Sequence, residues 1–309
     1  MRILITGGAG FIGSHVAEAY LQGGHEVIIV DNLSSGRKEN IPADAKFYLL
    51  DIRSAEIEQV FKIEKPDLVN HHAAQISVAV SSRNPILDSQ VNSQGLLNIL
   101  QSSVSNGVRK FIFISTGGAI YGDTENMPTP EEHDAQPLSP YGIHKLLGEN
   151  YLRFYKSQYG LDYSVLRYSN VYGPRQNPEG EAGVVAILIN QLLSGRVPTI
   201  YAYPDEPEGM SRDYVYVEDV ARVSLLAAVK GSAEIFNIGT EVATRTGTLY
   251  RKIGAFFASP PEPQRGEPLP GDLRNSCLST AKAKRVLNWT PRFDLAQGLK
   301  KTVDHFKEN

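Results

Sequence analysis

The stretch that decides the fold is the N-terminal segment MRILITGGAGFIG, residues 1–13. A short apolar run, 2–6, leads directly into glycines at every third position, Gly7, Gly10 and Gly13. Glycine lets the backbone turn tightly and approach a phosphate, and the start of the next helix offers free N–H groups and the positive end of a dipole. The segment therefore predicts a strand, a phosphate-binding turn and a helix, in the context typical of a dinucleotide site.

Apolar runs and helical patterns alternate through the first half of the chain. The first helix, with Val16 and Tyr20 on one face, ends near Gly23, and long helices are predicted over 85–106 and 140–159. Continuous apolar runs are typical of strands that are buried on both faces. The alternation predicts an α/β fold with a doubly wound parallel sheet. The predicted strands are 2–6, 27–30, 47–50, 68–71, 110–115 and 163–168.

The pattern loosens after about residue 173. Proline and glycine become frequent at 204–209 and 260–271, which predicts a smaller, mixed α/β lobe that is partly interleaved with the first. We therefore divide the chain into a first domain, 1–172, and a second lobe, 173–309, with a return to the first domain at about 213–235.

Composition narrows the classes of function. The chain has 309 residues, 41% of them hydrophobic and 21% charged, with a net charge of −3, so it is globular and has no basic surplus for nucleic acid or an anionic membrane. Cys277 is the only cysteine, which excludes an intramolecular disulfide and a cysteine-rich zinc site, and no metal is predicted. No apolar run approaches the roughly 18 residues of a membrane span, and the N-terminus lacks signal-peptide features, so we expect a cytoplasmic protein.

Asp31 indicates which dinucleotide binds. It stands 18 residues beyond Gly13, at the end of the second predicted strand. A carboxylate there accepts a hydrogen bond from the ribose 2′-hydroxyl and repels a 2′-phosphate, which favours NAD over NADP. Arg37 and Lys38 follow closely and keep the alternative open, since a cation near this turn can accept the 2′-phosphate.

Three residues are candidates for proton transfer. Tyr141 and Lys145 are one helical turn apart and share a face of the predicted helix, and Thr116 ends the fifth predicted strand, at the edge of the sheet where ligands bind. A phenol is a poor base at neutral pH, but a neighbouring ammonium stabilises the phenolate. Such a pair can take a proton from a hydroxyl while hydride leaves the same carbon. An ordinary pair on a helix surface is the alternative, because this spacing occurs often by chance.

In combination these residues resemble a known family. The segments that carry the likeness are the glycine loop, Asp31, Asp51-Ile52, His71-His72-Ala73-Ala74, Asn92, residues 115–122 (STGGAIYG), Tyr141 with Lys145, and residues 167–170 (RYSN). The chain is similar to the extended short-chain dehydrogenase/reductases, and among them to the UDP-glucose (UDP-galactose) 4-epimerases, through residues 287–291 (LNWTP).

The resemblance implies a Rossmann-type sheet, NAD as cofactor and a UDP-sugar as substrate. Tyr141 would take the C4 hydroxyl proton as hydride passes to NAD, with Lys145 and Thr116 assisting, and hydride would return to the other face of the 4-keto sugar. The implied substrate contacts are Thr116, Tyr141, Asn170, Arg212 and Ser276. The implied cofactor contacts are Gly7, Gly10, Phe11, Ile12, Asp31, Asn32, Ser35, Gly36, Asp51, Ile52, Ala73, Ala74, Gln75, Asn92, Ser115, Tyr141, Lys145, Tyr168 and Val171.

Several features of the substrate lobe depart from the family. Leu269 stands where an arginine is common before the Gly271-Asp272 pair, so the second diphosphate-binding arginine stays open, with Arg265 the nearest candidate. Ser276 aligns with a large tyrosine wall of several relatives, which leaves room for N-acetylated sugars. The resemblance also implies a homodimer through the helices 85–106 and 139–159.

Other functions on this fold stay open. Related dehydratases carry two carboxylates directly after the threonine, whereas this chain has two glycines after Thr116, which disfavours dehydration. A UDP-uronate epimerase or decarboxylase is an alternative enzyme. A non-enzymatic NAD-dependent regulator is a third class, and the intact Thr116, Tyr141 and Lys145 argue against it.

Overall fold

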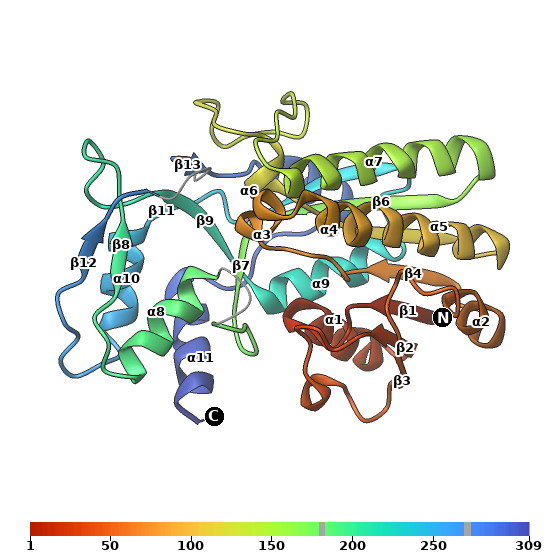
Figure 1. The fold of residues 1–309 in the computed structure, drawn as a ribbon, viewed down its shortest axis with the longest axis horizontal. Coiled ribbons are helices and arrows are strands. Elements are labelled where there is room, and N and C mark those ends of the chain that lie inside the picture. Colours follow the sequence, from red (N-terminus) through yellow and green to blue (C-terminus); the bar gives the residue numbers. More distant parts are fainter. Residues whose placement is uncertain (179–182, 269–272, 309) are drawn as a thin grey trace.

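Seven parallel strands form the central sheet of the computed structural model, which describes residues 1–178, 183–268 and 273–308 (Figure 1). The strands lie in the order β10-β6-β5-β4-β1-β2-β3, and each pairs with its neighbours in parallel. All six strands expected from the sequence are present, whereas β10 was not predicted. Their bounds are β1 (Arg2–Thr6), β2 (Glu26–Asp31), β3 (Lys46–Leu49), β4 (Leu68–His71), β5 (Lys110–Thr116), β6 (Asp162–Tyr168) and β10 (Glu234–Ile238).

Helices cover both faces of this sheet because alternate strand residues point to opposite sides. Ile3 and Ile5 of β1 pack with α1 (Phe11–Gln22) and α9 (Val217–Ala227). Leu4 of the same strand packs into the opposite cluster. That cluster includes α2 (Ile57–Glu64), α5 (Leu96–Ser105) and α7 (Pro140–Tyr159). The prediction of a doubly wound sheet is therefore confirmed.

The long helix expected over 85–106 is interrupted. It consists of α4 (Pro85–Ser89), a π-helical turn (Gln90–Gly95) and α5. Two contacts accompany the change of winding. The Asn92 side chain bonds the main chain of Gln75, and Gly95 lies so close to Ile52 that a Cβ would be 2.5 Å from its Cδ1. Wide turns of this kind are frequent at functional sites.

The second lobe is mixed, as expected. In its four-stranded sheet β9 pairs with β7, β11 and β13, and a separate pair is formed by β8 and β12. A third apolar core fills this lobe and includes Tyr172, Leu188 and Leu249. The bounds are β7 (Asn170–Tyr172), β8 (Thr199–Tyr201), β9 (Ser211–Tyr216), β11 (Ala243–Arg245), β12 (Gln264–Gly266), β13 (Asn275–Ser276), α8 (Val184–Leu193), α10 (Thr246–Gly254) and α11 (Leu295–Glu308).

The chain crosses between the lobes more than once. After β9 it passes through α9, which packs on α1, and then enters the seven-stranded sheet as β10 beside β6. A boundary at 172 coincides with the end of β7. The division into 1–172 and 173–309 stays a prediction. No helix of the described residues is long and apolar enough to cross a membrane.

Candidate active site

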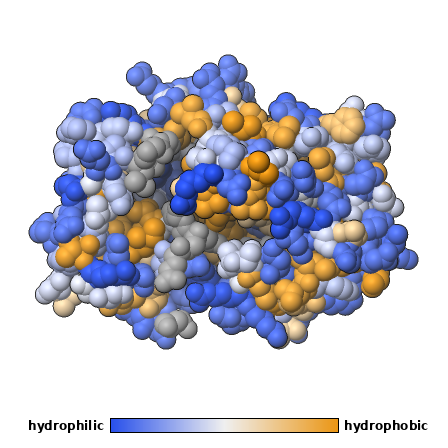
Figure 2. Space-filling view, viewed as in Figure 1, coloured by the Kyte–Doolittle hydropathy of each residue, from blue (hydrophilic) through white to orange (hydrophobic). Residues whose placement is uncertain are grey.

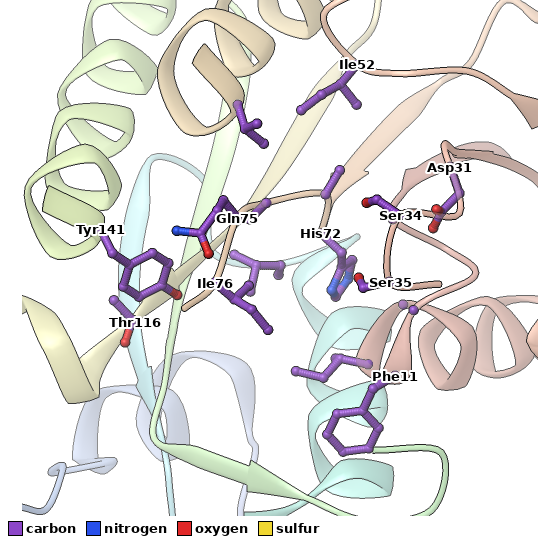
Figure 3. Close-up of a pocket in the computed structure, with 18 of the residues that line it drawn as sticks. Phe11, Asp31, Ser34, Ser35, Ile52, His72, Gln75, Ile76, Thr116 and Tyr141 are labelled. Carbon is purple, nitrogen blue, oxygen red and sulfur yellow. The ribbon is translucent and has the colours of Figure 1, made fainter. Parts of the chain in front are cut away.

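A cavity of about 580 Å³ opens at the carboxyl ends of the central strands. β1 and β4 are neighbours in the sheet although two strands separate them in the sequence, so the strand order reverses here, which is the usual ligand position in such sheets. Figure 2 shows the surface hollowed near the middle of the viewed face. In Figure 3, Tyr141 and Thr116 lie at one end of the cavity and Asp31, Ser34 and Ser35 at the other.

Most residues expected to contact the cofactor line this cavity. The expected residues that line it are Gly7, Gly10, Phe11, Ile12, Asp31, Asn32, Ser35, Asp51, Ile52, Ala73, Ala74, Gln75, Ser115, Thr116, Tyr141, Lys145, Tyr168, Asn170 and Val171. Four expected residues are not among the described lining: Gly36, Asn92, Arg212 and Ser276. Further lining residues that the sequence did not single out as contacts include Ser34, Arg53, His72, Ile76, Ser169 and Gln176.

The glycine loop is shaped so that no side chain fits at two of its positions. Gly7 has a φ of +71°, and a Cβ there would stand 2.7 Å from the amide nitrogen of Ala73. A Cβ on Gly13 would stand 2.2 Å from the carbonyl oxygen of Gly7. The Gly7 amide donates to the carbonyl oxygen of Val30 at 2.8 Å, which ties the loop to β2. The bare backbone at the start of α1 therefore faces the cavity, as a pyrophosphate site requires.

Asp31 ends β2 at the rim of the cavity and is almost buried. Its carboxylate accepts from the amides of Ala9 at 3.0 Å and Leu33 at 2.8 Å. Burial raises the pKa of Asp31, and these two hydrogen bonds oppose the rise. Each oxygen retains acceptor capacity for a ribose hydroxyl. Neither Arg37 nor Lys38 is among the described residues that line the cavity, and this favours NAD over NADP.

A charge pair that the sequence pattern did not indicate lies at Asp51, one of the expected cofactor contacts. Asp51 accepts two bonds from the Arg53 guanidinium, both at 2.8 Å, and a third from the Asn32 amide at 2.9 Å. The Arg53 hydrogen bonds hold the pKa of Asp51 well below its usual range. Arg53 stands two residues after Asp51, a spacing that was visible in the sequence but carried no chemistry by itself.

His72, like Arg53, lines the cavity although the sequence pattern did not predict it as a contact. Its Nε2 atom is buried and has no hydrogen-bond partner among the described residues. Burial, with a smaller contribution from the Lys145 charge, lowers the pKa of His72 to about 3, so the ring is neutral at physiological pH. A buried ring nitrogen that lines a cavity and lacks a partner is suited to contact a polar ligand group.

The three candidate proton-transfer residues meet where β5 ends and α7 begins. Ser139 caps α7 by accepting from the Gly142 amide at 3.2 Å, which fixes the first turn that carries Tyr141. Lys145 is buried, donates to the carbonyl of Ile114 at 2.8 Å, and has its Nζ 5.8 Å from the centre of the Tyr141 ring. Thr116 lies beside the Tyr141 hydroxyl and acts to lower the pKa of that phenol. The trio expected from the sequence is thus assembled at the cavity wall.

The electrostatics of this trio are dominated by burial. Burial raises the pKa of Tyr141, the negative charge of Asp88 adds to the rise, and the Thr116 hydrogen bond opposes it. Burial lowers the pKa of Lys145 to about 8, against the charges of Asp88 and Glu149. A positive charge beside the tyrosine is what favours its phenolate form.

A buried ion pair lies behind the trio. Glu149, two turns after Tyr141 on α7, binds the Arg167 guanidinium through bonds of 2.9 and 2.7 Å. It also accepts from the Ser115 hydroxyl at 2.6 Å. Arg167 in turn donates to the Tyr121 hydroxyl at 2.7 Å. The end of β5, where Thr116 stands, is thereby tied to α7.

Two expected cofactor residues lie behind the cavity wall. Asn92 is buried in the π-helical turn, where its side chain accepts from the Gln75 amide at 2.9 Å and donates to the Gln75 carbonyl at 2.8 Å. Gly36 packs against Asp31 and Ala9. Asn92 therefore shapes the wall through Gln75.

Two expected substrate residues, Arg212 and Ser276, are not among the described residues that line the cavity, whereas Asn170 lines it. Arg212 donates to the carbonyls of Leu273 at 2.7 Å and Ser211 at 2.9 Å. Ser276 is paired with Arg212 across β13 and β9. The positions of Leu269 and the Gly271-Asp272 pair lie outside the described residues.

Two further arginines of this lobe hold the loop 203–209. Arg265 bonds the carbonyl of Pro207. Arg274, which no sequence pattern singled out, pairs with Asp205 at 2.9 Å and stacks on the Tyr203 ring at 3.9 Å. The loop 203–209 is therefore held by β12 and by the residue that directly precedes β13.

Fold and site together define a dinucleotide-dependent α/β enzyme, and comparison with known proteins agrees. The family model described as NAD dependent epimerase/dehydratase family matches residues 3–239, so the chain belongs to this family.

Several relatives resemble the chain over almost its full length. A UDP-glucose 4-epimerase of Mycolicibacterium smegmatis is 41% identical and covers 99% of both chains. The crystal structure of Thermotoga maritima UDP-glucose 4-epimerase with UDP-glucose is 49% identical, has a TM-score of 0.96, and covers 100% of this chain and 99% of that one. The Thermus thermophilus UDP-glucose 4-epimerase in complex with NAD is 45% identical, with a TM-score of 0.95 and 99% of both chains covered.

Proposed function

We propose that this protein is an NAD-dependent UDP-hexose 4-epimerase that interconverts UDP-glucose and UDP-galactose. The observation that carries the proposal is the assembly of Tyr141, Lys145 and Thr116 at one end of a cavity whose other end is a glycine cradle with Asp31. An enzyme that oxidises and reduces the same carbon requires a proton-transfer group and the redox ring of a dinucleotide beside that carbon. A dinucleotide held at the cradle would reach the trio along this cavity.

The residues present fit NAD. The cradle at Gly7 and Gly13 has no room for side chains, Asp31 has acceptor capacity at the ribose position, and His72 presents a buried nitrogen without a partner among the described residues. Bound NAD supplies the acceptor and donor of hydride at C4 of the sugar. Gly7, Gly10, Phe11 and Ile12 would hold its pyrophosphate end, and the remaining cofactor contacts expected from the sequence are proposed here on the same grounds.

The chain's own residues account for the proton. Tyr141 takes the proton of the C4 hydroxyl, and Thr116 bridges that hydroxyl and the phenol oxygen. Lys145, fixed by the Ile114 carbonyl, supplies the positive charge that favours the phenolate. When the keto sugar presents its other face, Tyr141 returns the proton, and the configuration at C4 is inverted.

Epimerisation is favoured over dehydration by the two positions after Thr116. A dehydratase needs an acid and a base there, but a Cβ on Gly117 would stand 2.3 Å from the buried Leu278 side chain. Gly118 has open space, since a Cβ there would stand 3.8 Å from the Asn170 amide oxygen and 3.9 Å from the Thr116 hydroxyl, yet it offers no side chain. The site therefore lacks the acid and base of a dehydratase at both positions.

The UDP-sugar itself is proposed to contact Asn170 at the cavity, and Arg212 and Ser276 in the second lobe. Arg212 and Ser276 are cross-strand partners, so a ligand that reaches one also meets the other. A fixed guanidinium fork is suited to a diphosphate. Ser276 is small, which supports acceptance of an acetamido group. A UDP-uronate substrate is the competing hypothesis and would show itself in the product analysis below.

We also propose a homodimer in the cytoplasm. On α7 the side chains of Ile143, Leu147 and Phe154 are 51%, 37% and 50% exposed, and Ile86 of α4 is 71% exposed. Apolar groups at this density on a helix face favour a second copy as partner. Light scattering should give twice the monomer mass, and a monomer at assay concentration would contradict the proposal.

The test of the function uses the purified protein without added cofactor. Denaturation should release about one NAD per chain, and NMR should show UDP-galactose forming from UDP-glucose. Tyr141→Phe should lower turnover by roughly 10² to 10⁴ while nucleotide-sugar binding persists. Absence of nucleotide together with a requirement for NADP, or conversion of only a UDP-uronate, would refute the proposed function.

A further inference from the structure

A completely buried carboxylate stands beside the proton-transfer trio and takes no part in the steps above. Asp88, on α4, is 0% exposed. Its Oδ1 accepts from the side-chain amides of Gln75 at 2.6 Å and Asn92 at 3.0 Å. Its Oδ2 is bonded to Nδ1 of His144 at 2.5 Å. The three donors come from the loop after β4, from the π-helical turn and from α7.

His144 lies inside the catalytic turn of α7. It is three residues after Tyr141 and directly precedes Lys145, so its side chain leaves the helix close to that of Tyr141. A carboxylate oxygen is only an acceptor, which means that Nδ1 of His144 carries the hydrogen. His144 therefore donates to a buried charge from the same turn that carries the tyrosine.

The carboxylate connects the two ends of the site. Gln75 lines the cavity and is held through both its main chain and its side chain. Its main-chain amide donates to Asn92, and its side-chain amide donates to Asp88. Asp88 is thus one hydrogen bond from the cofactor wall and one from the catalytic turn. A shift of Asp88 would move Gln75 and α7 relative to each other.

The charge of Asp88 also acts on the trio. It raises the pKa of Tyr141 and opposes the lowering of the pKa of Lys145. Lys145 from α7 and Thr116 from β5 also lie beside Tyr141, and the ring of His144 is directed to Asp88. His72, from the loop after β4, is neutral. Among the described residues, Asp88 is the carboxylate whose charge raises the pKa of Tyr141.

On the basis of the proposed function, we infer that Asp88 and His144 form a positioning pair for Tyr141. The His144 hydrogen bond holds the Asp88 carboxylate in place and partly neutralises it, and the pair thereby fixes both the position of the catalytic turn and the pH at which Tyr141 becomes a base. The effect of His144 comes from its Nδ1 donor and not from imidazole chemistry. A purely structural capping role for Asp88 would leave the titration of Tyr141 unchanged.

The test measures the titration of Tyr141 directly in the NAD-loaded protein. In each background the tyrosinate absorbance is recorded against the same protein with Tyr141→Phe, so that the difference reports this tyrosine alone. The backgrounds are the unchanged chain, Asp88→Asn, His144→Asn, which keeps a donor at the Nδ1 position, and His144→Leu, which removes it. Matched controls away from the site are Asp304→Asn and His25→Asn.

Asp88→Asn should move the titration of Tyr141 to lower pH by about one unit, since a nearby negative charge is lost. His144→Leu should move it to higher pH, because the carboxylate loses a donor, and should lower turnover at neutral pH about tenfold. His144→Asn and both controls should match the unchanged chain. The acid limb of kcat/KM against pH should shift in the same directions.

Three outcomes would overturn the inference: no downward shift in Asp88→Asn, no upward shift in His144→Leu, or equal behaviour of His144→Asn and His144→Leu. Failure of the proposed function is seen separately. In that case the unchanged chain does not convert UDP-glucose, whereas the absorbance titrations are unaffected by the choice of substrate.

Discussion

Removing Glu149 should destabilise the protein severely, because it leaves a buried cation without its carboxylate. The side chains of Glu149 and Arg167 are 1% and 4% exposed. Glu149→Leu deletes the acceptor of three hydrogen bonds, two from Arg167 and one from Ser115. Leucine is close to glutamate in size, so the packing volume around α7 changes little.

The size of the effect follows from the burial of the pair. Breaking a buried ion pair by removing one partner costs about 3–5 kcal/mol, mainly because the remaining charge is not solvated. For chains somewhat smaller than this one, each kcal/mol lowers the melting temperature by about 2–4 °C. We therefore expect Glu149→Leu to lower the melting temperature by between about 6 and 20 °C.

The matched control removes both charges. Glu149→Leu with Arg167→Met removes both charges of this pair, and replacing both members of such a pair with apolar groups is often close to neutral. Thermal unfolding followed by circular dichroism should show the double variant recovering most of the loss. A single variant that loses less than about 1 kcal/mol, or a double variant no more stable than the single, would refute the argument that the uncompensated Arg167 charge causes the loss.

Three further predictions concern the loop, the lysine and the sugar pocket. Gly13→Ala places a methyl 2.2 Å from the carbonyl oxygen of Gly7. We expect this variant to lose about 1–3 kcal/mol of its free energy of unfolding and to lose bound NAD on purification. The control Gly254→Ala places its methyl 3.3 Å from the Pro260 side chain and should keep both its stability and its NAD. Burial lowers the pKa of Lys145 to about 8, so the folded apoenzyme loses this proton at lower pH than the unfolded chain does. Its free energy of unfolding should therefore rise between about pH 8 and about pH 10.4, relative to that of Lys145→Met. Parallel pH profiles of the two proteins would contradict this. Ser276→Tyr should lower kcat/KM for UDP-N-acetylgalactosamine relative to UDP-galactose, and an unchanged ratio would remove Ser276 as the gate.

The part of the fold that depends on local pattern was predictable. β1, β4 and the bounds of α7 agree with the apolar runs, with the Pro140 start and with the Gly160 stop. β10 was missed because Glu234 and Asn237 interrupt the apolar run of EIFNI, so its pairing with β6 is what identifies it. The π-helical turn was missed because it depends on Asn92 reaching Gln75, a contact between segments far apart in sequence.

The candidate site shows the same division. Tyr141, Thr116 and Asp31 were found because their spacing and their places at strand ends carry chemical meaning. Asp88 was not found, although it stands four residues before Asn92 on the same helical stretch, because a carboxylate in a helix is ordinary until its burial is known. Arg212 was expected to contact the substrate. Its side chain donates to the carbonyls of Ser211, on the same strand, and of Leu273, and the contact with Leu273 joins distant segments that the sequence alone does not bring together.

The late arrival of β10 has a consequence for biosynthesis. While the ribosome has released only the first 172 residues, the backbone edge of β6 has no neighbour on the side that β10 will occupy, and the apolar face of α1, including Tyr20, lacks the cover of α9. A nascent chain must keep that edge away from other chains until residue 238 has emerged. A gene fragment cut at the lobe boundary should therefore yield aggregates, and circular permutants should be recovered best when β10 and β6 are translated close together.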